Sequence, residues 1–338
     1  MINSADIVVG LAWGDEAKGK ITSHLASLSK GDSSYYDFVA RWNGGSNAGH
    51  TIYIGEDVFK THIVPCGVLH GIKSVIGPNC VLNAESFYRE LDGLDSKGVD
   101  VSLVKVSPRC HIVSNEHIEF DKNNLSKRLG TTSSGIAPAY SDKAARVGTL
   151  AGDVLDHNLI WDEELYGNVL CEGAQGVWLD INRGNYPWVT SSETIPYSAC
   201  SLGFPTQVIN NIYGAAKIYD TRSGEDPMFP TSLLDDPLLR RIADAGSEFG
   251  VTTGRRRKVN WLNLNLLLDS INLTGTTSLL ISKCDILEEV GVFRLFYNDN
   301  ILNFGSLDDM KRFIKLKVNE SCRFVNKIGF SHSPRSLG

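Results

Sequence analysis

Short apolar runs recur along this chain, and helix-like stretches lie between several of them. The helix-like stretches include ESFYRELDGL (85–94) and LNLNLLLDSI (262–271), in which apolar residues recur with the period of an α-helix. The runs that we expect to form strands are IVVGLAW (7–13), YDFVARW (36–42), SVIGPNCVL (74–82), VLCEGAQG (169–176), INNIYGAAKIY (209–219) and TSLLISKCD (277–285). Strands that alternate with helices predict an α/β fold, with a mainly parallel central sheet flanked by helices. We expect one domain that spans residues 1–338.

Residues 10–20, GLAWGDEAKGK, form a glycine-rich turn between the first apolar run and a helix-like stretch. A strand, a glycine-rich turn and a helix start together make a cradle for phosphate, because backbone N–H groups and the helix dipole point at the anion. The turn does not match the Walker A sequence. It also carries Asp15 and Glu16, which would repel a bound phosphate unless a metal ion or a proton transfer were involved. This conflict indicates catalysis rather than binding alone.

The charge of the chain argues against a general nucleic-acid-binding protein. The formal net charge is −6 and the pI is about 5.8, and basic residues are concentrated only locally, in GRRRK (254–258). The N-terminus lacks the basic and apolar regions of a secretory signal, and there is no run of about 18 apolar residues. The seven cysteines are scattered without metal-site spacing, so we expect buried, reduced thiols in a cytoplasmic protein.

Two further glycine-rich segments carry polar side chains suited to a ligand. In RWNGGSNAGHT (41–51), Asn47 offers a hydrogen-bonding amide and His50 offers an imidazole that can handle a proton. In the segment around Gln175, an amide between glycines can donate to and accept from a base edge at once. A lone histidine is more often structural, but the glycine-rich loop around His50 favours a function.

The segment 123–148 is too long for an ordinary loop, so we interpret it as a functional excursion. Its hydroxyl and glycine residues, GTTSSG (130–135), suit contacts to phosphate or carboxylate. We expect Arg146 to lie on a helix after Asp142 and Lys143. A solvated helix face held by salt bridges is an equally good interpretation of these charges.

Two basic segments predict contacts to anions and to a purine. In GVTTGRRRKVNW (250–261), arginine forks suit carboxylates, which they can grip with two hydrogen bonds. A nuclear-localisation or nucleic-acid patch is the alternative, but the flanking glycine, threonine and apolar residues favour a folded anion loop. At the end of the last apolar run, Asp285 can accept hydrogen bonds from N1 and the 2-amino group of guanine. The stem of Lys283 can pack on the purine ring.

Seven of these segments, in order, resemble the adenylosuccinate synthetase family. They are WGDEAKGK, RWNGGSNAGHT, GTTSSGIAPAYSDKAARVG, EGAQGVWLDINRGNYPWVTSSET, FPTSL, EFGVTTGRRRK and SKCD, with a fainter match at GFSHSPRSLG. The resemblance implies a fold related to P-loop GTPases and a homodimer. It implies a ligase that joins IMP and L-aspartate, with GTP as energy donor and Mg²⁺ as cofactor, to give adenylosuccinate, GDP and phosphate.

The residues fit this chemistry. The 6-oxo group of a purine leaves poorly until it is phosphorylated, after which the amine of aspartate can displace phosphate. The first step needs a base that removes the N1 proton, and the resemblance assigns this role to Asp15. It assigns to His50 the stabilisation of the transferring phosphoryl group, and to Gln175 the purine O6 region. Mg²⁺ would be held by Asp15 and the backbone carbonyl of Gly49.

The resemblance also implies three sets of binding residues. For GTP they are Glu16, Lys18, Gly19, Lys20, Gly49, His50, Thr51, Lys283, Asp285, Ser331, Ser333 and Arg335. For the acceptor nucleotide they are Asp15, Asn47, Ala48, Thr131, Thr132, Arg146, Gln175 and Thr190. For aspartate they are Thr252, Thr253, Arg255 and Arg257. Arg146 would reach across the dimer to complete the neighbouring site.

The chain departs from the family pattern at several positions. Ala17 replaces a usual glycine, Ser23 stands where Asp is usual, and Ser134 stands where Arg is usual. SGEDPMF (223–229) replaces a glycine-rich VGxGPF segment. The chain is also shorter than common bacterial and eukaryotic members and nearer in length to archaeal and viral relatives.

These departures leave an alternative acceptor. Some viral relatives join aspartate to dGMP, for 2-aminoadenine DNA, and in those the catalytic Asp tends to become a small residue. Asp15 is retained here, which favours IMP, and dGMP is the alternative. A GTP-binding protein without ligase activity is a further alternative, against which the intact Asp15, His50 and Gln175 set argues. We expect no nucleic-acid or membrane partner, and a location in the cytoplasm, or the host cytoplasm if the chain is viral.

Overall fold

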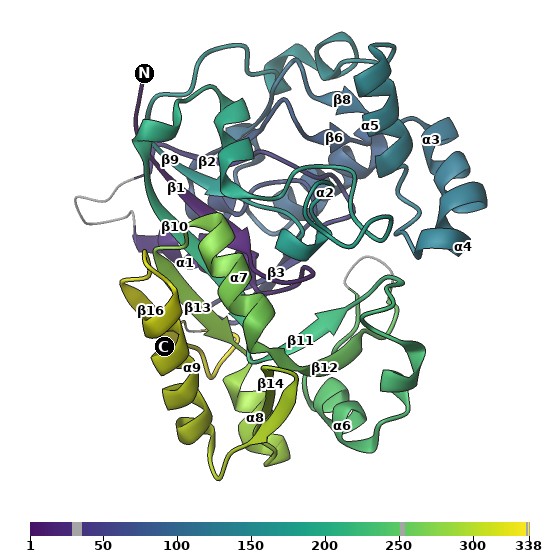
Figure 1. Cartoon of the computed structure of the whole chain (residues 1–338). Helices are drawn as coiled ribbons and strands as arrows, with labels where there is room; N and C mark the ends of the chain where they lie inside the picture. The colour runs from purple at the N-terminus through teal and green to yellow at the C-terminus, as the bar shows by residue number, and fades with distance from the viewer. Residues whose placement is uncertain (29–35, 251–253, 336, 338) are drawn as a thin grey trace.

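The computed structural model describes residues 1–28, 36–250, 254–335 and 337. Its centre is an eight-stranded sheet in the order β16-β13-β10-β1-β9-β2-β5-β7, in which every pairing is parallel (Figure 1). Its strands are β1 (Ile2–Gly10), β2 (Phe38–Arg41), β5 (Lys73–Ile76), β7 (Val104–Val106), β9 (Gly167–Glu172), β10 (Ile209–Lys217), β13 (Ser278–Ser282) and β16 (Lys327–Phe330). The predicted parallel α/β sheet is therefore confirmed.

Helices cover both faces of this sheet, because successive side chains of a strand point to opposite faces. On one face, Val8 packs in a cluster with Ile21 of α1 (Lys18–Ser27). On the other face, Val9 packs in a cluster with Ile271 of α7 (Leu264–Thr274). Strands buried on both faces read as continuous apolar runs, which explains the first run of the sequence.

Each of the six predicted runs contains a strand of the central sheet, and two of them are divided. Residues 74–82 form β5 and then, after a turn closed by Cys80 N–H on the Gly77 carbonyl, β6 (Val81–Leu82). Residues 209–219 are divided between β10 and β11 (Tyr219–Arg222), which pairs in another sheet. An apolar run by itself does not show where one strand ends and the next begins, or to which sheet each strand belongs.

The predicted helices are present with shifted ends. Residues 85–94 lie in α2 (Ala84–Asp95). The stretch 262–271 lies mainly in α7, but its first two residues belong to β12 (Lys258–Asn263). Asn263 ends that strand and caps the helix, because its side-chain oxygen accepts from the N–H of Leu266 at 3.2 Å.

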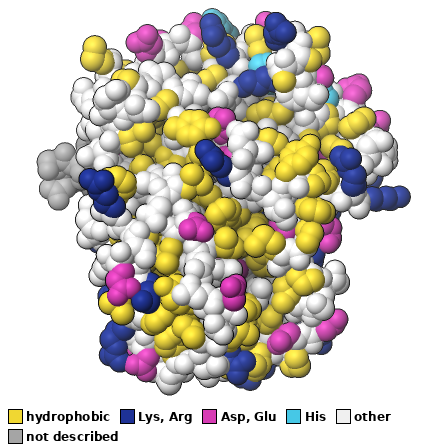
Figure 2. All heavy atoms as spheres, viewed as in Figure 1, with side chains coloured by type: hydrophobic (Ala, Val, Ile, Leu, Met, Phe, Trp, Pro, Cys, Tyr) yellow, Lys and Arg dark blue, Asp and Glu magenta, His cyan; other side chains and the backbone are white. Residues whose placement is uncertain are grey.

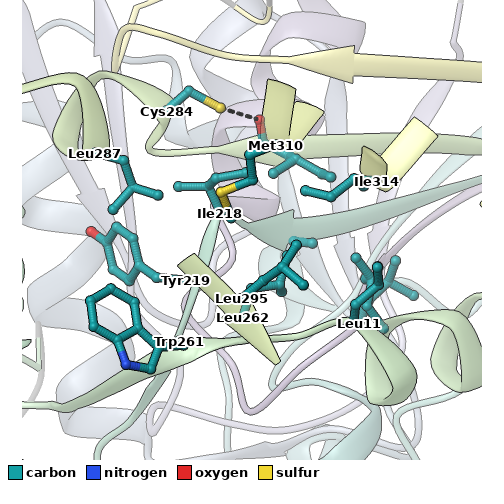
Figure 3. Close-up of a cluster of buried hydrophobic side chains, with 14 of the residues drawn as sticks. Leu11, Ile218, Tyr219, Trp261, Leu262, Cys284, Leu287, Leu295, Met310 and Ile314 are labelled. Carbon is teal, nitrogen blue, oxygen red and sulfur yellow. Dashed lines mark hydrogen bonds between the residues drawn. The ribbon is translucent and has the colours of Figure 1, made fainter. Parts of the chain in front are cut away.

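A second sheet, in the order β11-β12-β14-β15, lies beside the first. β14 (Arg294–Tyr297) and β15 (Asn300–Asn303) form a hairpin in it. Figure 3 shows how Trp261 and Leu295 of this sheet meet Met310 and Ile314 of α9 (Leu307–Ser321) in one buried cluster. The helices α6 (Pro237–Ala245) and α8 (Cys284–Val290) contribute to the same cluster.

The remaining elements are short. They are β3 (His50–Ile54), β4 (Asp57–Thr61), β8 (His111–Ile112), α3 (Asn115–Phe120), a π-helical turn (Asp121–Leu125), α4 (Ser126–Leu129), α5 (Ile136–Ala145) and 3₁₀ segments at Cys66–His70, Val101–Leu103, Ala151–Asp153, His157–Leu159, Val177–Leu179, Pro196–Leu202, Thr206–Val208 and Thr231–Leu234. The excursion 123–148 is thus largely helical. The prediction that Arg146 lies on a helix is wrong, because α5 ends at Ala145 and Arg146 takes the left-handed conformation (φ 65°) that caps it.

All seven cysteines are free thiols, six of them buried and Cys200 half-buried. In the described part of the chain, every helix is too short or too polar to cross a membrane. On the face shown in Figure 2, Lys and Arg side chains are scattered among Asp and Glu instead of forming one stripe.

The carboxyl ends of five parallel strands bring the chemically distinctive loops together. β1, β2, β9, β10 and β13 all end at the same edge of the sheet. The loops that follow β1, β2 and β9 hold the three glycine-rich segments of the sequence. In an open α/β sheet this edge is where ligands bind.

Leu279→Ala should lower the free energy of unfolding by about 2–5 kcal/mol, because Leu279 of β13 is fully buried and the loss of its side chain leaves a cavity. Leu316→Ala is the matched control on α9, since the Leu316 side chain is 51% exposed and should change stability by only about 0.5 kcal/mol. Urea unfolding of both variants measures the difference. Equal losses would contradict the placement of Leu279 in the core.

Candidate active site

Two pockets open at the carboxyl edge of the central sheet. The first has a volume of ≈ 200 Å³ and we call it the Gln175 pocket. Among the residues that line it are Trp13, Asn47, Ala48, Thr131, Thr132, Gln175, Thr190, Arg222 and Arg255. All the acceptor-nucleotide residues that the sequence predicted, apart from Arg146, are therefore gathered in one cavity.

The second pocket has a volume of ≈ 530 Å³ and we call it the Asp285 pocket. Among the residues that line it are Gly19, Lys20, Thr51, Lys217, Arg257, Lys283, Asp285 and Ser333. These come from the start of α1, from β3, from the end of β10, from the residue before β12, from the residues after β13, and from the C-terminal segment. Most of the predicted GTP-binding residues lie here.

The two pockets share four lining residues, which are Asp15, Lys18, Gly49 and His50. Asp15 and Lys18 come from the glycine-rich turn after β1, and Gly49 and His50 come from the loop that leads into β3. We call this place the junction. A ligand in either pocket would contact the same acid, amine and imidazole.

Glu16, one of the two acids that were expected to repel phosphate, holds the glycine-rich turn in its conformation. The buried Glu16 carboxylate accepts from the N–H of Gly14 at 2.7 Å and forms an ion pair with Lys18 at 2.6 Å. Glu16 lines neither pocket, so its charge lies beneath the turn. Asp15 and Ala17 both have left-handed backbones, with φ of 64° and 72°. A glycine at position 17 would adopt that conformation freely, whereas a residue with a side chain pays about 1–2 kcal/mol.

A buried charge network reaches Asp15 from the segment between α6 and β12. Arg257 lies between two carboxylates, with Nε 2.9 Å from Asp15 Oδ2 and Nη1 2.6 Å from Glu248 Oε2. The Nζ of Lys217 donates to the same Glu248 oxygen at 2.9 Å. Burial by itself would raise the pKa of Glu248, but the two cations outweigh it and hold the pKa at about 2. Glu248 is therefore ionised and fixes the fork that grips Asp15.

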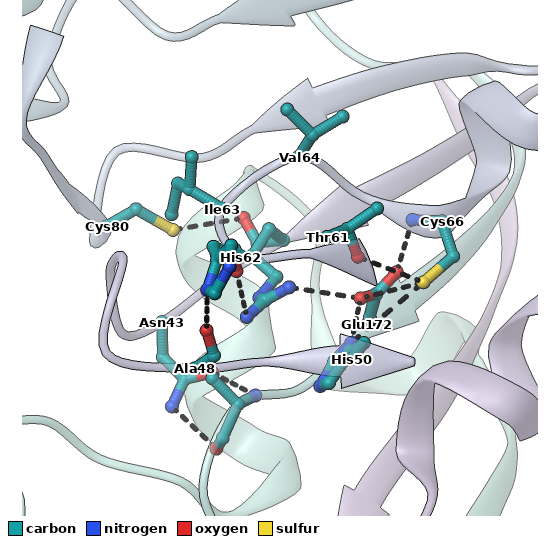
Figure 4. A network of polar contacts seen from close by, with 12 residues as sticks. Asn43, Ala48, His50, Thr61, His62, Ile63, Val64, Cys66, Cys80 and Glu172 are labelled. Atoms are coloured by element: carbon teal, nitrogen blue, oxygen red, sulfur yellow. Dashed lines mark hydrogen bonds and ion pairs between the residues drawn. The ribbon is translucent and has the colours of Figure 1, made fainter. Parts of the chain in front are cut away.

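A second network holds His50, as Figure 4 shows. Its Nδ1 lies 2.6 Å from Oε1 of the buried Glu172 at the end of β9. The same carboxylate pairs with Arg41 at 3.0 Å and accepts from the N–H of Cys66 at 2.7 Å. Burial opposes ionisation, but His50, Arg41 and the Cys66 N–H lower the pKa of Glu172 to about 2. Burial also lowers the pKa of His50, against the pull of Glu172.

The Gln175 side chain is poised for a ligand. Its amide oxygen and nitrogen are both buried, and neither has a hydrogen-bond partner among the described residues. The side chain passes close to Gly44, where an added Cβ would stand 2.9 Å from its oxygen. A buried amide without partners costs about 1–3 kcal/mol, which a hydrogen-bonding ligand would remove. This is the amide that the sequence predicted would read a purine edge.

The predicted guanine-reading pair sits on a turn and a helix instead of on a strand end. β13 stops at Ser282, Lys283 takes a left-handed backbone (φ 66°), and Asp285 lies in the first turn of α8. Lys20 spans from α1 to the C-terminal segment, where it donates to Ser331 Oγ and to the Ser333 carbonyl, both at 2.5 Å. Burial lowers the pKa of Lys20 to about 8, although Asp285 attracts its charge.

Some predicted residues lie elsewhere. Arg146 is exposed and lines neither pocket. Arg335 forms an ion pair with Glu56 at 3.1 Å outside both pockets. Ser331 contacts Lys20 without lining the Asp285 pocket. Thr252 and Thr253 fall outside the described residues.

The unusual segment 223–229 braces one wall of the Gln175 pocket. The Nη2 of Arg222 donates to the Trp188 carbonyl at 2.7 Å, and its Nε lies 3.3 Å from Asp226. Asp226 in turn accepts from the amide of Asn185 at 2.9 Å. Two loops that line the pocket are therefore tied together by the acid that distinguishes this segment.

Sequence reasoning missed the buried acids that hold the site. Glu172 stands in the quoted segment EGAQG and Glu248 in EFGVTTGRRRK, but neither was given a role. The available signal was an acid directly after an apolar run, since a buried carboxylate needs cationic partners. The partners of Glu248 lie 31 residues before it and nine after it, which no local pattern reveals.

The parallel sheet, the phosphate-type turn and the two pockets at its carboxyl edge are the features of an α/β enzyme that binds phosphate-containing ligands. The sequence profile of the adenylosuccinate synthetase family matches residues 7–166 and 158–297. The chain belongs to the adenylosuccinate synthetase family, whose members are GTP-dependent ligases of purine biosynthesis.

Relatives with this activity match most of the chain. The adenylosuccinate synthetase of Moorella thermoacetica is 36% identical over 350 residues, covering 86% of this chain and 80% of its own. That of Clostridium botulinum is 35% identical, covering 91% and 86%. The fully ligated enzyme of Plasmodium falciparum superposes with a TM-score of 0.76 at 28% identity, covering 90% of this chain and 84% of its own.

A phage enzyme shares the fold. The succinoaminodeoxyadenylate synthetase PurZ of cyanophage S-2L, in a structure bound to dGMP and to dATP as energy donor, superposes with a TM-score of 0.74. It is 18% identical, and the match covers 99% of this chain and 94% of the phage enzyme.

Stability should fall in acid because of Glu248. Its pKa lies at about 2 in the folded protein, below its ordinary value of 4.5, so the stabilisation is present above pH 4.5 and is lost as the pH falls toward 2. The full shift corresponds to on the order of 3 kcal/mol. Urea unfolding between pH 6 and pH 3 should show a shallower pH dependence in Glu248→Gln than in the unaltered chain. Glu85→Gln is the control, because Glu85 is 74% exposed, and it should keep the original dependence.

Proposed function

We propose that this chain joins L-aspartate to position 6 of IMP, with GTP as the phosphoryl donor. One observation carries the proposal, which is that Asp15, Lys18, Gly49 and His50 line both pockets. A phosphoryl group that passed from a nucleotide in one pocket to a nucleotide in the other would cross at the junction. Such in-line placement is the main contribution that a protein makes to phosphoryl transfer.

IMP fits the Gln175 pocket. The orphaned amide of Gln175 offers a donor and an acceptor to the purine edge around O6. Asn47, Thr131 and Thr132 line the same cavity and offer uncharged groups to a 5′-phosphate. Thr190 faces them from the loop that Arg222 braces.

GTP fits the Asp285 pocket. Lys18 and Lys20 at the start of α1 supply positive charge for the donor phosphates, beside the N–H groups of the first helical turn. Asp285 lines the far part of the pocket and can accept from N1 and the 2-amino group of guanine. Lys283 lies next to it.

The chemistry follows from this arrangement. Asp15 takes the N1 proton of IMP, O6 attacks the γ-phosphorus, and GDP leaves as the P–O bond to its β-phosphate breaks. His50 lies at the junction, where it contacts the group in transfer. The amine of aspartate then bonds to C6 and loses a proton, and the C6–O6 bond breaks with release of phosphate, which takes up that proton. Asp15 thus serves the first step through its position at the junction.

The residues present fit Mg²⁺. The Asp15 carboxylate and the Gly49 carbonyl are hard oxygen ligands of the kind that Mg²⁺ prefers, and both line the junction. Mg²⁺, when bound, would neutralise charge on the donor phosphates.

The two loop arginines face different pockets. Arg255 lines the Gln175 pocket, where its fork donates to the carbonyls of Gly130 at 3.2 Å and Thr131 at 2.9 Å. It is therefore placed to exchange these neutral partners for a carboxylate of aspartate. Arg257 is held by Asp15 and Glu248, and it could reach aspartate only by releasing one of these carboxylates.

Arg146 supports a dimer in this proposal. It is exposed on a left-handed cap and lines neither pocket of its own chain, as a residue that serves a neighbouring subunit would be. We place the reaction in the cytoplasm, in keeping with the family.

The test is a panel of acceptors. Purified protein with Mg²⁺, GTP and aspartate is offered IMP, dIMP, GMP and dGMP in turn, and products are resolved by chromatography. We expect adenylosuccinate from IMP, and loss of turnover by about 10²–10⁴-fold in Asp15→Asn. Product from dGMP alone would establish the alternative acceptor. Turnover of none of the four, with GTP still bound, would indicate a binding protein and would overturn the proposal.

Asp285→Asn should weaken the use of GTP relative to XTP. Xanthine carries an oxygen where guanine carries its 2-amino group, so an amide donor suits xanthine better than a carboxylate does. Hydrogen bonds with one charged partner contribute about 1.5–3 kcal/mol, or about one to two powers of ten in the ratio of kcat/KM values. Kinetics with each donor give this ratio, and an unchanged ratio would remove Asp285 from guanine recognition.

Arg255→Leu should raise the KM for aspartate far more than the KM for either nucleotide. The lost bidentate contact leaves a carboxylate unpaired, which costs about 2–5 kcal/mol in a closed site and less in a solvated one. Arg256→Leu is the matched control, since Arg256 points to Asp244 and lines neither pocket. A raised KM for IMP with an unaltered KM for aspartate would show that Arg255 serves phosphate instead.

A further inference from the structure

The imidazole of His50 lies against a carboxylate that is already fully engaged. Glu172 is completely buried, and Oε2 accepts from the backbone N–H of Cys66 at 2.7 Å. Oε1 accepts from Nη1 of Arg41 at 3.0 Å and from the thiol of Cys66 at 3.3 Å. A carboxyl group that accepts from an arginine and a backbone N–H in the interior is ionised, because a protonated oxygen would lose these partners.

The ionised state of Glu172 decides which nitrogen of His50 carries a proton. Nδ1 lies 2.6 Å from Oε1, a distance at which an unprotonated nitrogen would set its lone pair against a full negative charge. Nδ1 is therefore a donor. Turning the ring over would face a carbon to the carboxylate and lose this hydrogen bond.

The imidazole is also packed closely on one side. Gly19 of α1 packs against it, and an added Cβ at position 19 would stand 2.5 Å from His50 Cβ and 3.0 Å from Nδ1. The imidazole is thus held between the glycine of a helix start and the carboxylate at the end of β9. These two contacts come from different elements, and together they restrict the rotation of the ring.

We infer that Glu172 is a positioning residue that keeps a proton on Nδ1 of His50 and so reserves Nε2 for the junction between the two pockets. Nδ1 keeps this proton whether the ring holds one proton or two. Any hydrogen bond that His50 makes to a group in transfer therefore runs through Nε2, and donation to a phosphoryl oxygen requires the second ring proton there. The inference deepens the proposed function and rests on it for its catalytic consequence, but the position of the proton can be measured without any substrate.

A metal ion is the competing interpretation of the same residues. The ligand atoms of His50, Cys66 and Glu172 lie within 4.8 Å of one another, which is close enough for one cation. The guanidinium of Arg41 already supplies positive charge at Glu172, at 3.0 Å. The pKa of the Cys66 thiol is raised, chiefly by burial, so the thiolate that a metal would need is disfavoured. The cluster therefore suits a shared proton better than a metal ion.

The first measurement is the tautomer of His50 in the substrate-free protein. Long-range ¹H–¹⁵N correlation spectra distinguish a ring protonated at Nδ1 from one protonated at Nε2, and the signals of His50 are identified by their absence in His50→Asn. We expect the Nδ1–H form in the unaltered chain. A ring protonated at Nε2 alone would overturn the inference, whatever the enzyme turns over. Signals that change on addition of Zn²⁺, and return with a chelator, would overturn it in favour of a metal site.

The second measurement uses Glu172→Gln. An amide keeps the shape of the side chain but no longer compels Nδ1 to donate, so we expect loss of the pure Nδ1–H signature and a fall in kcat of about 10²-fold or more. The KM values for IMP, GTP and aspartate should stay within about threefold. Equal loss of kcat/KM through raised KM values, with the tautomer unchanged, would show that Glu172 serves only the shape of the pockets.

Glu90→Gln is the matched control for folding. Glu90 is half-buried and likewise accepts from backbone N–H groups, those of His62, Ile63 and Val64, but it does not touch His50. It should lose stability without a change in tautomer or in kcat. If Glu172→Gln fails to fold, Glu172→Asp replaces it, since the shortened carboxylate stays charged for Arg41 and draws back from Nδ1. An unaltered kcat in Glu172→Asp with a displaced tautomer would also overturn the inference.

Discussion

Two buried carboxylates, Glu172 and Glu248, hold His50 and the arginine that grips Asp15 at the place where the two pockets meet. Each stands in the interior with no exposed surface, and each is surrounded by cations and N–H donors. A buried charge of this kind is tolerated only when its partners are in place, because the charge has lost the solvation of water. The positions of His50 and of the Arg257 fork are therefore fixed by the need to satisfy these acids.

The two networks connect different parts of the fold to one point. Glu172 is the last residue of the central strand β9, and its carboxylate contacts the imidazole of His50. Glu248 follows α6 and reaches Asp15 through Arg257, with Lys217 at the end of β10 as its second cation. A displacement of the segment between α6 and β12 would thus change the surroundings of Asp15. Tyr219, one of the core residues labelled in Figure 3, donates its hydroxyl hydrogen bond to Glu248 at 2.8 Å and so links that core to the charge network.

Strain gathers at the same place. Asp15, Ala17, Gln175 and Lys283 all take left-handed backbones, which are unfavourable for residues with side chains. Each follows the end of a central strand, where the chain turns sharply to bring a side chain into a pocket. The surrounding packing of the parallel sheet holds these conformations, and at Gln175 it also leaves an amide without partners among the described residues.

The local patterns of the sequence determined the class of the fold and the identity of most pocket residues. Apolar runs alternating with helix-like stretches define a parallel sheet, and glycine-rich segments after those runs must lie at its carboxyl edge. This basis was enough to name Asp15, Asn47, His50, Gln175 and Asp285 as candidates, because loops that follow parallel strands lie together at the carboxyl edge of the sheet. Two of the predicted element ends were wrong by only one or two residues. Lys283 lies just after β13, and Arg146 lies just after α5.

Only the tertiary structure decided how these residues are held and which pocket each one faces. Glu172 meets Arg41 from 131 residues away, and Glu248 meets Lys217 across 31 residues, so the partners are set by strand order and not by spacing. Arg255 and Arg257 are two residues apart but face different pockets, because Asp15 and the buried Glu248 hold the guanidinium of Arg257. The sequence by itself determined which side chains are available for the chemistry. The tertiary structure decided their partners, because the solvation lost on burial is replaced by groups that only the fold brings together.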